Sequence, residues 1–344
     1  MKNRFMLAPL TNLQSHADGT LSDEEFHWLT LRARGGFGLV MTCAAHVQAI
    51  GQGFPGQLGV WSDQHVAGLT RLASEIRRHG SLGMVQLHHA GLRSPADLIG
   101  ASPVSASDDE KTGARALSTK EAEQLAEDFV RAALRAQHAG FDGVQVHGAH
   151  GYIVCQFLSA ETNRREDHYG GSLENRCRLL FDILEGIRAR CRPDFLLSVR
   201  LSPERFGMTL AETTVIAQRL MDSGLIDLLD MSLWDVCKEP EEADYRGKPL
   251  LDWFTALDRG EVRLSVAGKI RSASETVRVF AAGVDALTIG RAAILHHDFP
   301  ERCRDDPFFE PVELPVTPDY LRSEGLSDAF IGYLGNWQGF VAEE

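Results

Sequence analysis

Residues 118–152 decide the fold, and they read STKEAEQLAEDFVRAALRAQHAGFDGVQVHGAHGY. The first part predicts a helix, because Ser118 and Glu121 match the S-x-x-E capping box and Gly140 supplies a helix stop. Apolar residues recur along it at helical spacing: Ala122, Leu125, Ala126, Phe129 and Ala133. The apolar run at 141–147 has the length and composition of a buried strand. The segment is therefore one helix followed by one strand, with the apolar helix face packed on a sheet.

The same alternation of short apolar runs and helical stretches extends in both directions from this segment. Eight runs have strand length: RFMLAPL (4–10), FGLVMTC (37–43), SLGMVQL (81–87), FDGVQVH (141–147), FLLSVRL (195–201), IDLLDMS (226–232), VRLSVAG (262–268) and DALTIG (285–290). They are almost continuously apolar, as parallel strands buried on both faces should be. Two further capping boxes stand at Ser22 with Glu25 and at Ser272 with Glu275. The pattern predicts an α/β protein with the TIM (β/α)8 barrel fold.

No Pro/Gly/Ser-rich linker or low-complexity stretch divides the chain, so we expect residues 1–344 to form a single domain. Residues 91–117 form a polar excursion that is too long for an ordinary strand–helix loop, and we consider them a candidate lid. Residues 305–344 lie beyond the last predicted unit and form a C-terminal extension to which the sequence assigns no role.

Charge narrows the possible partners. The formal net charge is -13 at pH 7, which opposes a nucleic-acid or anionic-membrane surface because phosphate binding needs a clustered cationic face. We therefore expect a small-molecule substrate. The N-terminal stretch is interrupted at Pro9 before any long apolar run, so it reads as neither a signal peptide nor a membrane span. A cytoplasmic protein is the expectation.

The cysteines lie far apart and include no C-x-x-C pair. They therefore give no indication of a zinc site, an iron–sulfur cluster or a redox disulfide. They are Cys43, Cys155, Cys177, Cys191, Cys237 and Cys303. We expect buried or incidental thiols and no metal.

Active sites of TIM barrels are built at the carboxyl ends of the strands. Polar residues and glycines stand in or just after that part of six of the runs: Thr11, Gln86, His147, Arg200, Gly268 with Lys269, and Gly290 with Arg291. They are the first candidates for a functional site.

His147 and His150 follow the fourth run, and Tyr152 comes two residues later. The histidines could be satisfied by backbone groups, or they could form a metal pair, although the helical spacing and glutamate of H-E-x-x-H are missing. They could also act in catalysis. An unperturbed phenol has a pKa of roughly 10, so Tyr152 keeps its proton at neutral pH and could donate it. The alternative for Tyr152 is a half-buried loop aromatic.

Arg200 lies late in a buried strand and needs a partner, because an unpaired buried charge is costly. An anionic cofactor would serve, and so would an internal ion pair with Asp230 on a neighbouring run. Gly268-Lys269 and Gly290-Arg291 resemble the phosphate site that TIM barrels assemble after strands seven and eight. Ordinary turn glycines followed by solvated cations are the alternative.

Residues 51–56 read GQGFPG and match the dinucleotide pattern G-x-G-x-x-G. That fingerprint requires a helix to begin at the glycines. Pro55 and Gly56 prevent a helix there, so the sequence does not predict a Rossmann domain.

Residues 147–180 read HGAHGYIVCQFLSAETNRREDHYGGSLENRCRLL, and this stretch closely resembles the signature of the Old Yellow Enzyme family of flavin oxidoreductases. Supporting segments occur in the family's order: NRFMLAPLT, GLVMTCAAHV, GMVQLHHAG, LSVRLS, VAGKI and IGRA. The resemblance runs from residue 3 to about 295, and the rest of the chain matches poorly.

The resemblance implies an FMN-containing barrel whose flavin is reduced by NAD(P)H and then reduces an activated alkene in the same pocket, by a ping-pong cycle. The longer relatives with an iron–sulfur site are not implied. The residues that would contact the flavin ring are Ala8, Pro9, Leu10, Thr11, Ala44, Gln86, His147 and Arg200. Those that would hold its phosphate are Gly268, Lys269, Gly290 and Arg291.

By the same resemblance, His147 and His150 would donate hydrogen bonds to a carbonyl or nitro oxygen, and Tyr152 would protonate the α-carbon. Thr11 would tune the flavin and contact the substrate. Leu13 stands where a bacterial subgroup often carries a tyrosine, so substrate and subunit contacts do not transfer. The sequence leaves the oligomeric state unknown.

Two other activities remain open. An FMN-dependent oxidative demethylase or dehydrogenase of a small amine would use the same pocket, because the flavin can accept hydride from a carbon next to nitrogen. A non-catalytic flavin-binding protein would keep Arg200 and the phosphate loops but could dispense with Tyr152.

Overall fold

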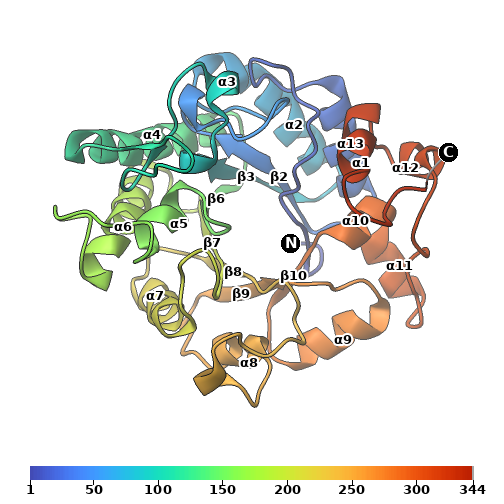
Figure 1. The fold of residues 1–344 in the computed structure, drawn as a ribbon. Coiled ribbons are helices and arrows are strands. Elements are labelled where there is room, and N and C mark those ends of the chain that lie inside the picture. Colours follow the sequence, from blue (N-terminus) through green and yellow to red (C-terminus); the bar gives the residue numbers. More distant parts are fainter. Residues whose placement is uncertain (343–344) are drawn as a thin grey trace.

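The computed structural model describes residues 1–342, which fold around a closed barrel of parallel strands in the order β1-β10-β9-β8-β7-β6-β3-β2 (Figure 1). The strands are β1 (Phe5–Leu7), β2 (Leu39–His46), β3 (Leu82–His88), β6 (Gly143–Gly148), β7 (Leu196–Leu201), β8 (Leu228–Ser232), β9 (Arg263–Ala267) and β10 (Ala286–Ile289). Each overlaps one of the apolar runs. The predicted single-domain TIM barrel is therefore confirmed.

Helices surround the barrel on all sides (Figure 1). The longer ones are α1 (Asp23–Arg34), α2 (Val66–Arg78), α4 (Thr119–His138), α6 (Leu173–Arg190), α7 (Leu210–Asp222) and α9 (Ala273–Ala281). The shorter ones are α3 (Ala96–Ile99), α5 (Ile153–Leu158), α8 (Leu250–Thr255), α10 (Arg291–Leu295), α11 (Phe299–Asp305), α12 (Pro318–Ser323) and α13 (Asp328–Leu334). The predicted apolar face of α4 is buried along its length, because it covers the barrel wall. Among residues 1–342, no helix is both long and apolar enough to cross a membrane.

The three predicted capping boxes can be compared with the first turns of α1, α4 and α9 in the structure. Those of α4 and α9 are complete, with the serine hydroxyl and the glutamate carboxylate each capping a backbone N–H. In α1 only half of the box forms. Ser22 accepts from the Glu25 backbone N–H, but the Glu25 carboxylate turns inward and accepts hydrogen bonds from Asn12 and Ser15. The carboxylate half of that prediction was wrong, because buried donors in the loop after β1 needed an acceptor.

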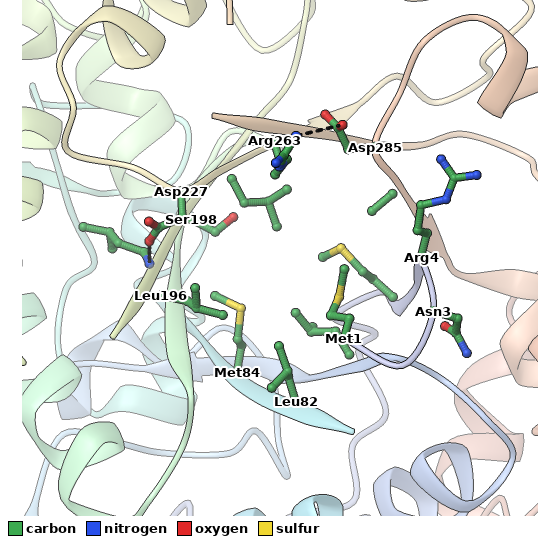
Figure 2. Close-up of a pocket in the computed structure, with 15 residues that line it drawn as sticks. Met1, Asn3, Arg4, Leu82, Met84, Leu196, Ser198, Asp227, Arg263 and Asp285 are labelled. Atoms are coloured by element: carbon green, nitrogen blue, oxygen red, sulfur yellow. Dashed lines mark hydrogen bonds and ion pairs between the residues drawn. The ribbon is translucent and has the colours of Figure 1, made fainter. Parts of the chain in front are cut away.

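The barrel interior is layered, as in other TIM barrels. The layer near the amino ends of the strands is an apolar cluster of Met6, Leu39, Met41, Met84 and Ala286. It borders a cavity of about 530 Å³ at that end of the barrel. Figure 2 shows Leu82, Met84 and Leu196 around this space, with the Arg263–Asp285 ion pair at its rim.

The next layer toward the carboxyl ends is polar and fully buried. It comprises Gln86, Gln145, Ser198, Asp230, Ser265 and Thr288. Gln86 donates to Gln145 at 2.8 Å, and Gln145 donates to Ser198 at 3.1 Å. Asp230 accepts from Ser265 at 3.0 Å and from Thr288 at 2.9 Å. Hydrogen bonding of this kind satisfies polar groups that would otherwise be costly to bury.

The C-terminal extension packs beside α1 and α10 (Figure 1). Buried Arg32 of α1 donates to the Ala293 carbonyl at 3.0 and 3.1 Å and to the Glu324 carbonyl at 2.7 Å. The Glu324 carboxylate accepts from His297. These bonds fix the extension to the barrel.

Candidate active site

Two cavities lie side by side at the carboxyl ends of the strands. The larger, about 640 Å³, contains the histidines and is called the histidine cavity here; the smaller, about 260 Å³, is called the glycine cavity. Seven residues line both: Pro9, Leu10, His150, Arg200, Trp234, Arg291 and Trp337. The two cavities therefore form one continuous cleft.

The structure brings every predicted site residue to this cleft. The histidine cavity is lined by Pro9, Leu10, Thr11, Ala44, Gln86, His147, His150, Tyr152, Arg200 and Arg291. The glycine cavity adds Ala8, Gly268, Lys269 and Gly290. Residues far apart in the sequence meet here because the carboxyl ends of all the strands open onto one face of the barrel.

A sharp turn after β6 gathers three of these side chains. His147 lies at the end of β6, and His150 has a φ of 62°, a left-handed conformation that non-glycine residues rarely adopt. The His150 N–H donates to Ser202 Oγ at 3.0 Å, which helps to hold this conformation. Tyr152 then begins α5 as its N-cap residue. The turn thus places two imidazoles and a phenol in the same cavity.

The imidazoles form a chain that continues beyond the predicted pair. His150 Nδ1 lies 2.8 Å from His147 Nε2, and His147 Nδ1 lies 3.0 Å from His88 Nδ1. At the other end His150 Nε2 lies 2.9 Å from Ser232 Oγ. Within residues 1–342, the buried Nε2 of His88 has no hydrogen-bond partner. Because each N–N contact holds one hydrogen, neutral rings satisfy this chain.

Burial keeps these rings neutral. Burial, together with the nearby charges of Arg200 and Arg93, lowers the pKa of His150 to about 3. The pKa of His147 is also far below its ordinary value, chiefly through burial. At neutral pH each ring is therefore an uncharged imidazole with one N–H, which the chain directs at a neighbouring ring or at Ser232.

Tyr152 is biased toward its protonated form. Burial raises the pKa of the phenol, even though the Arg93 guanidinium lies 4.7 Å from the ring centroid. Arg93 also donates to the His150 carbonyl at 2.6 Å, so it holds the turn that carries both side chains. The phenol remains available as a proton donor throughout the physiological range.

Arg200 on β7 is buried, with 6% of its surface exposed. Its Nε lies 3.4 Å from Asp230 Oδ2 but makes no hydrogen bond within residues 1–342, and its Nη2 donates to Ser232 at 3.2 Å. The ion pair considered from the sequence is therefore present but leaves donors unused. A buried cation with spare N–H groups suits an electron-rich ligand in the cleft.

The glycine cavity combines small residues with positive charge. A Cβ at position 268 would lie 2.9 Å from the Val236 backbone nitrogen, so only glycine fits there. At Gly290 an added Cβ would meet no protein atom closer than 3.7 Å and would occupy space beside the cavity. Lys269, Arg271 and Arg291 also line this cavity. Backbone N–H groups together with cations are typical of a phosphate site.

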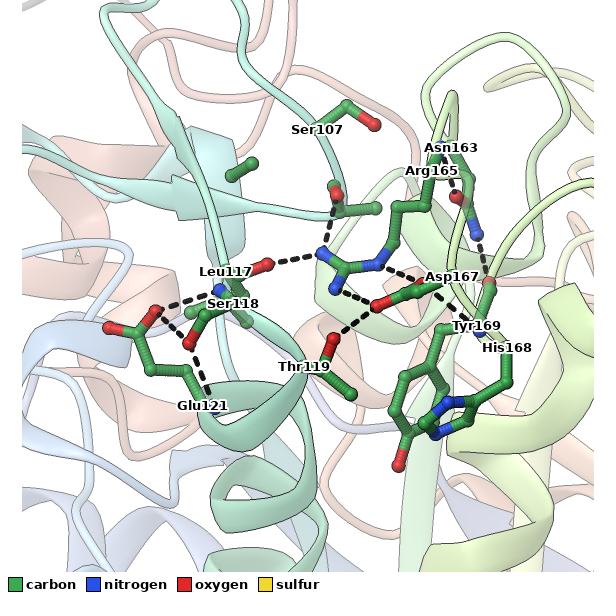
Figure 3. Close-up of polar contacts among 12 residues, drawn as sticks. Ser107, Leu117, Ser118, Thr119, Glu121, Asn163, Arg165, Asp167, His168 and Tyr169 are labelled. Carbon is green, nitrogen blue, oxygen red and sulfur yellow. Dashed lines mark hydrogen bonds and ion pairs between the residues drawn. The ribbon is translucent and has the colours of Figure 1, made fainter.

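The chain that follows α5 is fastened to the 91–117 excursion (Figure 3). Arg165 donates to the carbonyls of Ala106 and Leu117 and forms a bidentate pair with Asp167. The guanidinium holds the pKa of the Asp167 carboxyl well below its usual range. Asp167 also accepts from Thr119 at the start of α4, at 2.7 Å. The excursion carries the two-stranded sheet of β4 (Val104–Ser105) and β5 (Arg115–Ala116).

The excursion supplies no side chain to the lining of either cavity in the described structure. Its contact with the site runs through Arg93, which lies over the Tyr152 ring. Its role as a lid stays a prediction.

Sequence reasoning missed the outer wall of the cleft. The histidine cavity is also lined by Phe54, Trp234, Leu314, Tyr333, Trp337, Gln338 and Phe340. Phe54 belongs to the GQGFPG segment, which the sequence analysis considered only as a possible Rossmann fingerprint. The last five belong to the C-terminal extension, which carries no motif. His88 was missed as well, although its place beside Gln86 in GMVQLHHAG was a usable signal.

Within residues 1–342, no group of three or more His, Cys, Asp or Glu side chains is arranged to hold a metal ion. The described cysteines are all unpaired thiols, and Cys43, Cys155 and Cys177 are buried. The site is thus built from imidazole, phenol and guanidinium groups.

Known proteins resemble the chain over its whole barrel. Residues 1–306 match the model of the NADH:flavin oxidoreductase / NADH oxidase family. The chain is 34% identical over 306 residues to a probable NADH-dependent flavin oxidoreductase, YqiG, of Bacillus subtilis, covering 86% of this chain and 82% of that protein. It is 29% identical over 322 residues to an NADH:acrylate oxidoreductase of Vibrio harveyi, covering 89% of this chain and 32% of that protein.

Among solved structures, an Old Yellow Enzyme homologue from Zymomonas mobilis superposes with a TM-score of 0.79 and 28% identity, covering 95% of each chain. This likeness agrees with the matched family model over the barrel. The chain belongs to the NADH:flavin oxidoreductase family of Old Yellow Enzyme type and is an FMN-dependent NAD(P)H:flavin oxidoreductase.

Proposed function

We propose that this enzyme reduces the activated C=C bond of α,β-unsaturated carbonyl or nitro compounds, with NAD(P)H as the reductant. One observation carries the proposal: two neutral imidazoles, His147 and His150, and a protonated phenol, Tyr152, line the same cavity. Such a set can bind an oxygen and deliver a proton. The acrylate named for the Vibrio harveyi relative is also a conjugated alkene.

The residues present fit FMN. Arg200 offers unused donors beside the histidine cavity, where it would meet the pyrimidine part of the ring together with Gln86. The segment Ala8–Thr11 and Ala44 would contact the rest of the ring. Gly268, Lys269, Gly290 and Arg291 would hold the phosphate in the glycine cavity. Lys269 is already paired with Asp235 at 3.1 Å, so Arg291 would carry more of the charge.

When bound, the flavin supplies the hydride, which it takes from NAD(P)H and gives to the β-carbon of the substrate. His147 and His150 would each turn an N–H out of the imidazole chain toward the substrate oxygen, on which negative charge builds as the β-carbon gains hydride. Donors aimed at a developing negative oxygen typically contribute ~3 kcal/mol each to transition-state stabilisation. Because the rings are neutral, they bind the oxygen without protonating it.

Tyr152 completes the reduction by giving its proton to the α-carbon, so that one hydride and one proton are added across the C=C bond. Its raised pKa keeps the proton in place until the α-carbon becomes basic. Solvent then returns a proton to the phenolate.

The test is an anaerobic titration of the purified protein, followed by visible absorbance. We expect a flavin spectrum that bleaches with NADPH or NADH and returns on addition of 2-cyclohexenone. Flavin that bleaches with a nicotinamide but ignores the enone would overturn the proposed reaction. Bleaching by a secondary amine without any nicotinamide would support the oxidative alternative instead.

A further inference from the structure

The C-terminal extension forms one wall of the histidine cavity. Tyr333, Trp337 and Phe340 line it from this segment, together with Leu314. The aromatic rings contact one another in sequence: Tyr333 and Trp337 have centroids 5.9 Å apart, and Trp337 and Phe340 have centroids 5.4 Å apart. We call Tyr333, Trp337 and Phe340 the aromatic wall.

The aromatic wall is held in place at both ends. Phe330, one helical turn before Tyr333, packs edge-on against Trp28 of α1 at 5.0 Å. At the other end the backbone of Phe340 accepts from Val316 N–H at 3.1 Å, and Ala342 donates back to Val316 at 2.8 Å. Both ends of the wall are therefore tied to packed parts of the molecule, and the rings can present a fixed surface.

The aromatic wall shares the cavity with the catalytic groups. Tyr333 lines the same cavity as Tyr152, His147 and His150. Trp337 lines both cavities, and the Arg291 guanidinium lies 5.2 Å from its ring centroid. Phe54 lines the same cavity from the loop after β2. A molecule held by the histidines would thus occupy a space bounded by aromatic rings.

We infer that the aromatic wall determines substrate specificity, favouring alkenes that carry an aromatic ring over alkyl-substituted ones of the same reactivity. This inference rests on the proposed function and names the substrate class of that site. Stacked and edge-on ring contacts stabilise an aryl group beyond simple burial, whereas a methyl group in the same position would leave much of the wall uncovered. Neither the family resemblance nor the strand-end residues require this preference.

The experiment compares two aldehydes that differ only at the β-carbon, trans-cinnamaldehyde with a phenyl group and crotonaldehyde with a methyl group. The measured quantity is the ratio of their kcat/KM values with the FMN-loaded enzyme. We expect Trp337→Ala to lower this ratio at least tenfold, because kcat/KM for trans-cinnamaldehyde falls much more than kcat/KM for crotonaldehyde. An unchanged ratio, which includes an equal fold-loss for both aldehydes, would overturn the inference.

Trp253→Ala is the matched control, because Trp253 packs against Tyr245 and Lys248 and lines neither cavity of the cleft. The control should keep the wild-type ratio. If Trp337→Ala loses FMN or folds poorly, Trp337→Leu retains apolar volume without the ring and should lower the ratio in the same direction.

A second readout does not depend on turnover. A phenol bound next to the flavin would perturb its visible spectrum, so phenol and 4-phenylphenol can be titrated into the oxidised holoenzyme. We expect 4-phenylphenol to bind at least ten times more tightly than phenol, and Trp337→Ala to remove this preference. Suppose that neither aldehyde proves to be a substrate while Trp337→Ala still removes the preference for 4-phenylphenol. In that case the proposed reaction is wrong, but the aromatic wall does select aromatic ligands. If the preference survives, the wall does not select ligands.

Discussion

The two ends of the barrel use the same strands for opposite purposes. At the amino ends the interior is apolar, with Met6, Met41 and Met84 in one cluster beside a cavity of about 530 Å³. At the carboxyl ends Arg200 and the histidines line a cavity of about 640 Å³. The two cavities are of similar size, so volume alone does not identify the functional end.

What separates the two ends is the buried polar layer between them. Asp230, Ser265 and Thr288 satisfy one another inside the barrel, and Asp230 also lies 3.4 Å from Arg200. The layer thus supports a buried cation on the side where the ligand binds. The amino end has no such support in the described structure, and its charges, such as Arg263 with Asp285, pair at the rim. The carboxyl end can therefore bind a charged ligand, because its buried polar groups are held in place by hydrogen bonds.

The largest expected effect lies at the carboxyl end. Tyr152→Phe removes the proton donor and keeps the ring, so reoxidation of the reduced flavin by 2-cyclohexenone should slow by about 10²- to 10⁴-fold, the usual contribution of a general acid. Flavin reduction by NADPH should change little. Stopped-flow absorbance separates the two half-reactions, and equal slowing of both would remove Tyr152 from the proton-donor role.

The next prediction compares the two interior layers directly. Asp230→Ala removes the acceptor for Ser265 and Thr288 and leaves Arg200 without its carboxylate, so it should lower the free energy of unfolding by about 3–5 kcal/mol. Met6→Ala in the apolar cluster should lower it by about 2–5 kcal/mol. Only Asp230→Ala should also weaken FMN binding. Urea unfolding gives the free energy of unfolding, and FMN titration gives the affinity for FMN. If Met6→Ala weakened FMN binding as much as Asp230→Ala, the proposed difference between the two ends of the barrel would be wrong.

A third prediction concerns the donors of the histidine cavity. His147→Ala removes one N–H that would bind a phenolate oxygen, and a hydrogen bond to a charged group is worth about 1.5–3 kcal/mol. Phenol should therefore bind the oxidised enzyme about 10- to 100-fold more weakly. A spectral titration measures this, and unchanged affinity would exclude His147 from the ligand site. His16→Ala, at an exposed position, is the control.

The smallest predicted effect is on pH dependence. His89 accepts from the Gly91 N–H at Nδ1 and contacts Gln48 at Nε2, and burial lowers its pKa from 6.5 to about 3. Between those values the unfolded chain binds more protons than the folded protein, so stability falls as pH falls. His89→Gln should reduce this slope by up to about 1.4 kcal/mol per pH unit.

Thermal or urea unfolding at several pH values between 4 and 7 gives the slope for His89→Gln. His16→Gln, at an exposed position, should leave the slope close to that of the wild type. An identical slope in His89→Gln and wild type would show that His89 is not held neutral by the fold.

Sequence reasoning predicted the barrel well, because parallel strands buried on both faces leave a local apolar signal. It also located the strand-end residues, since the position of a TIM-barrel site follows from the fold. It could not predict the aromatic wall, which lines the same cavity as Tyr152 but lies far from it in the sequence and has no repeating pattern. Glu25 shows a similar limit: a local capping motif lost its carboxylate to Asn12 and Ser15, which only the folded loop brings near.

The chain of imidazoles gives the site a property beyond acidity. In neutral rings linked from Ser232 through His150 and His147 to His88, every N–H can point toward His88 or every N–H can point toward Ser232. These two arrangements have the same charge and opposite dipoles. When the N–H groups point toward Ser232, its hydroxyl keeps its own hydrogen free for the glycine cavity, which it lines; in the other arrangement that hydroxyl donates to His150. The cavity can thus reverse its local polarity without gaining or losing a proton.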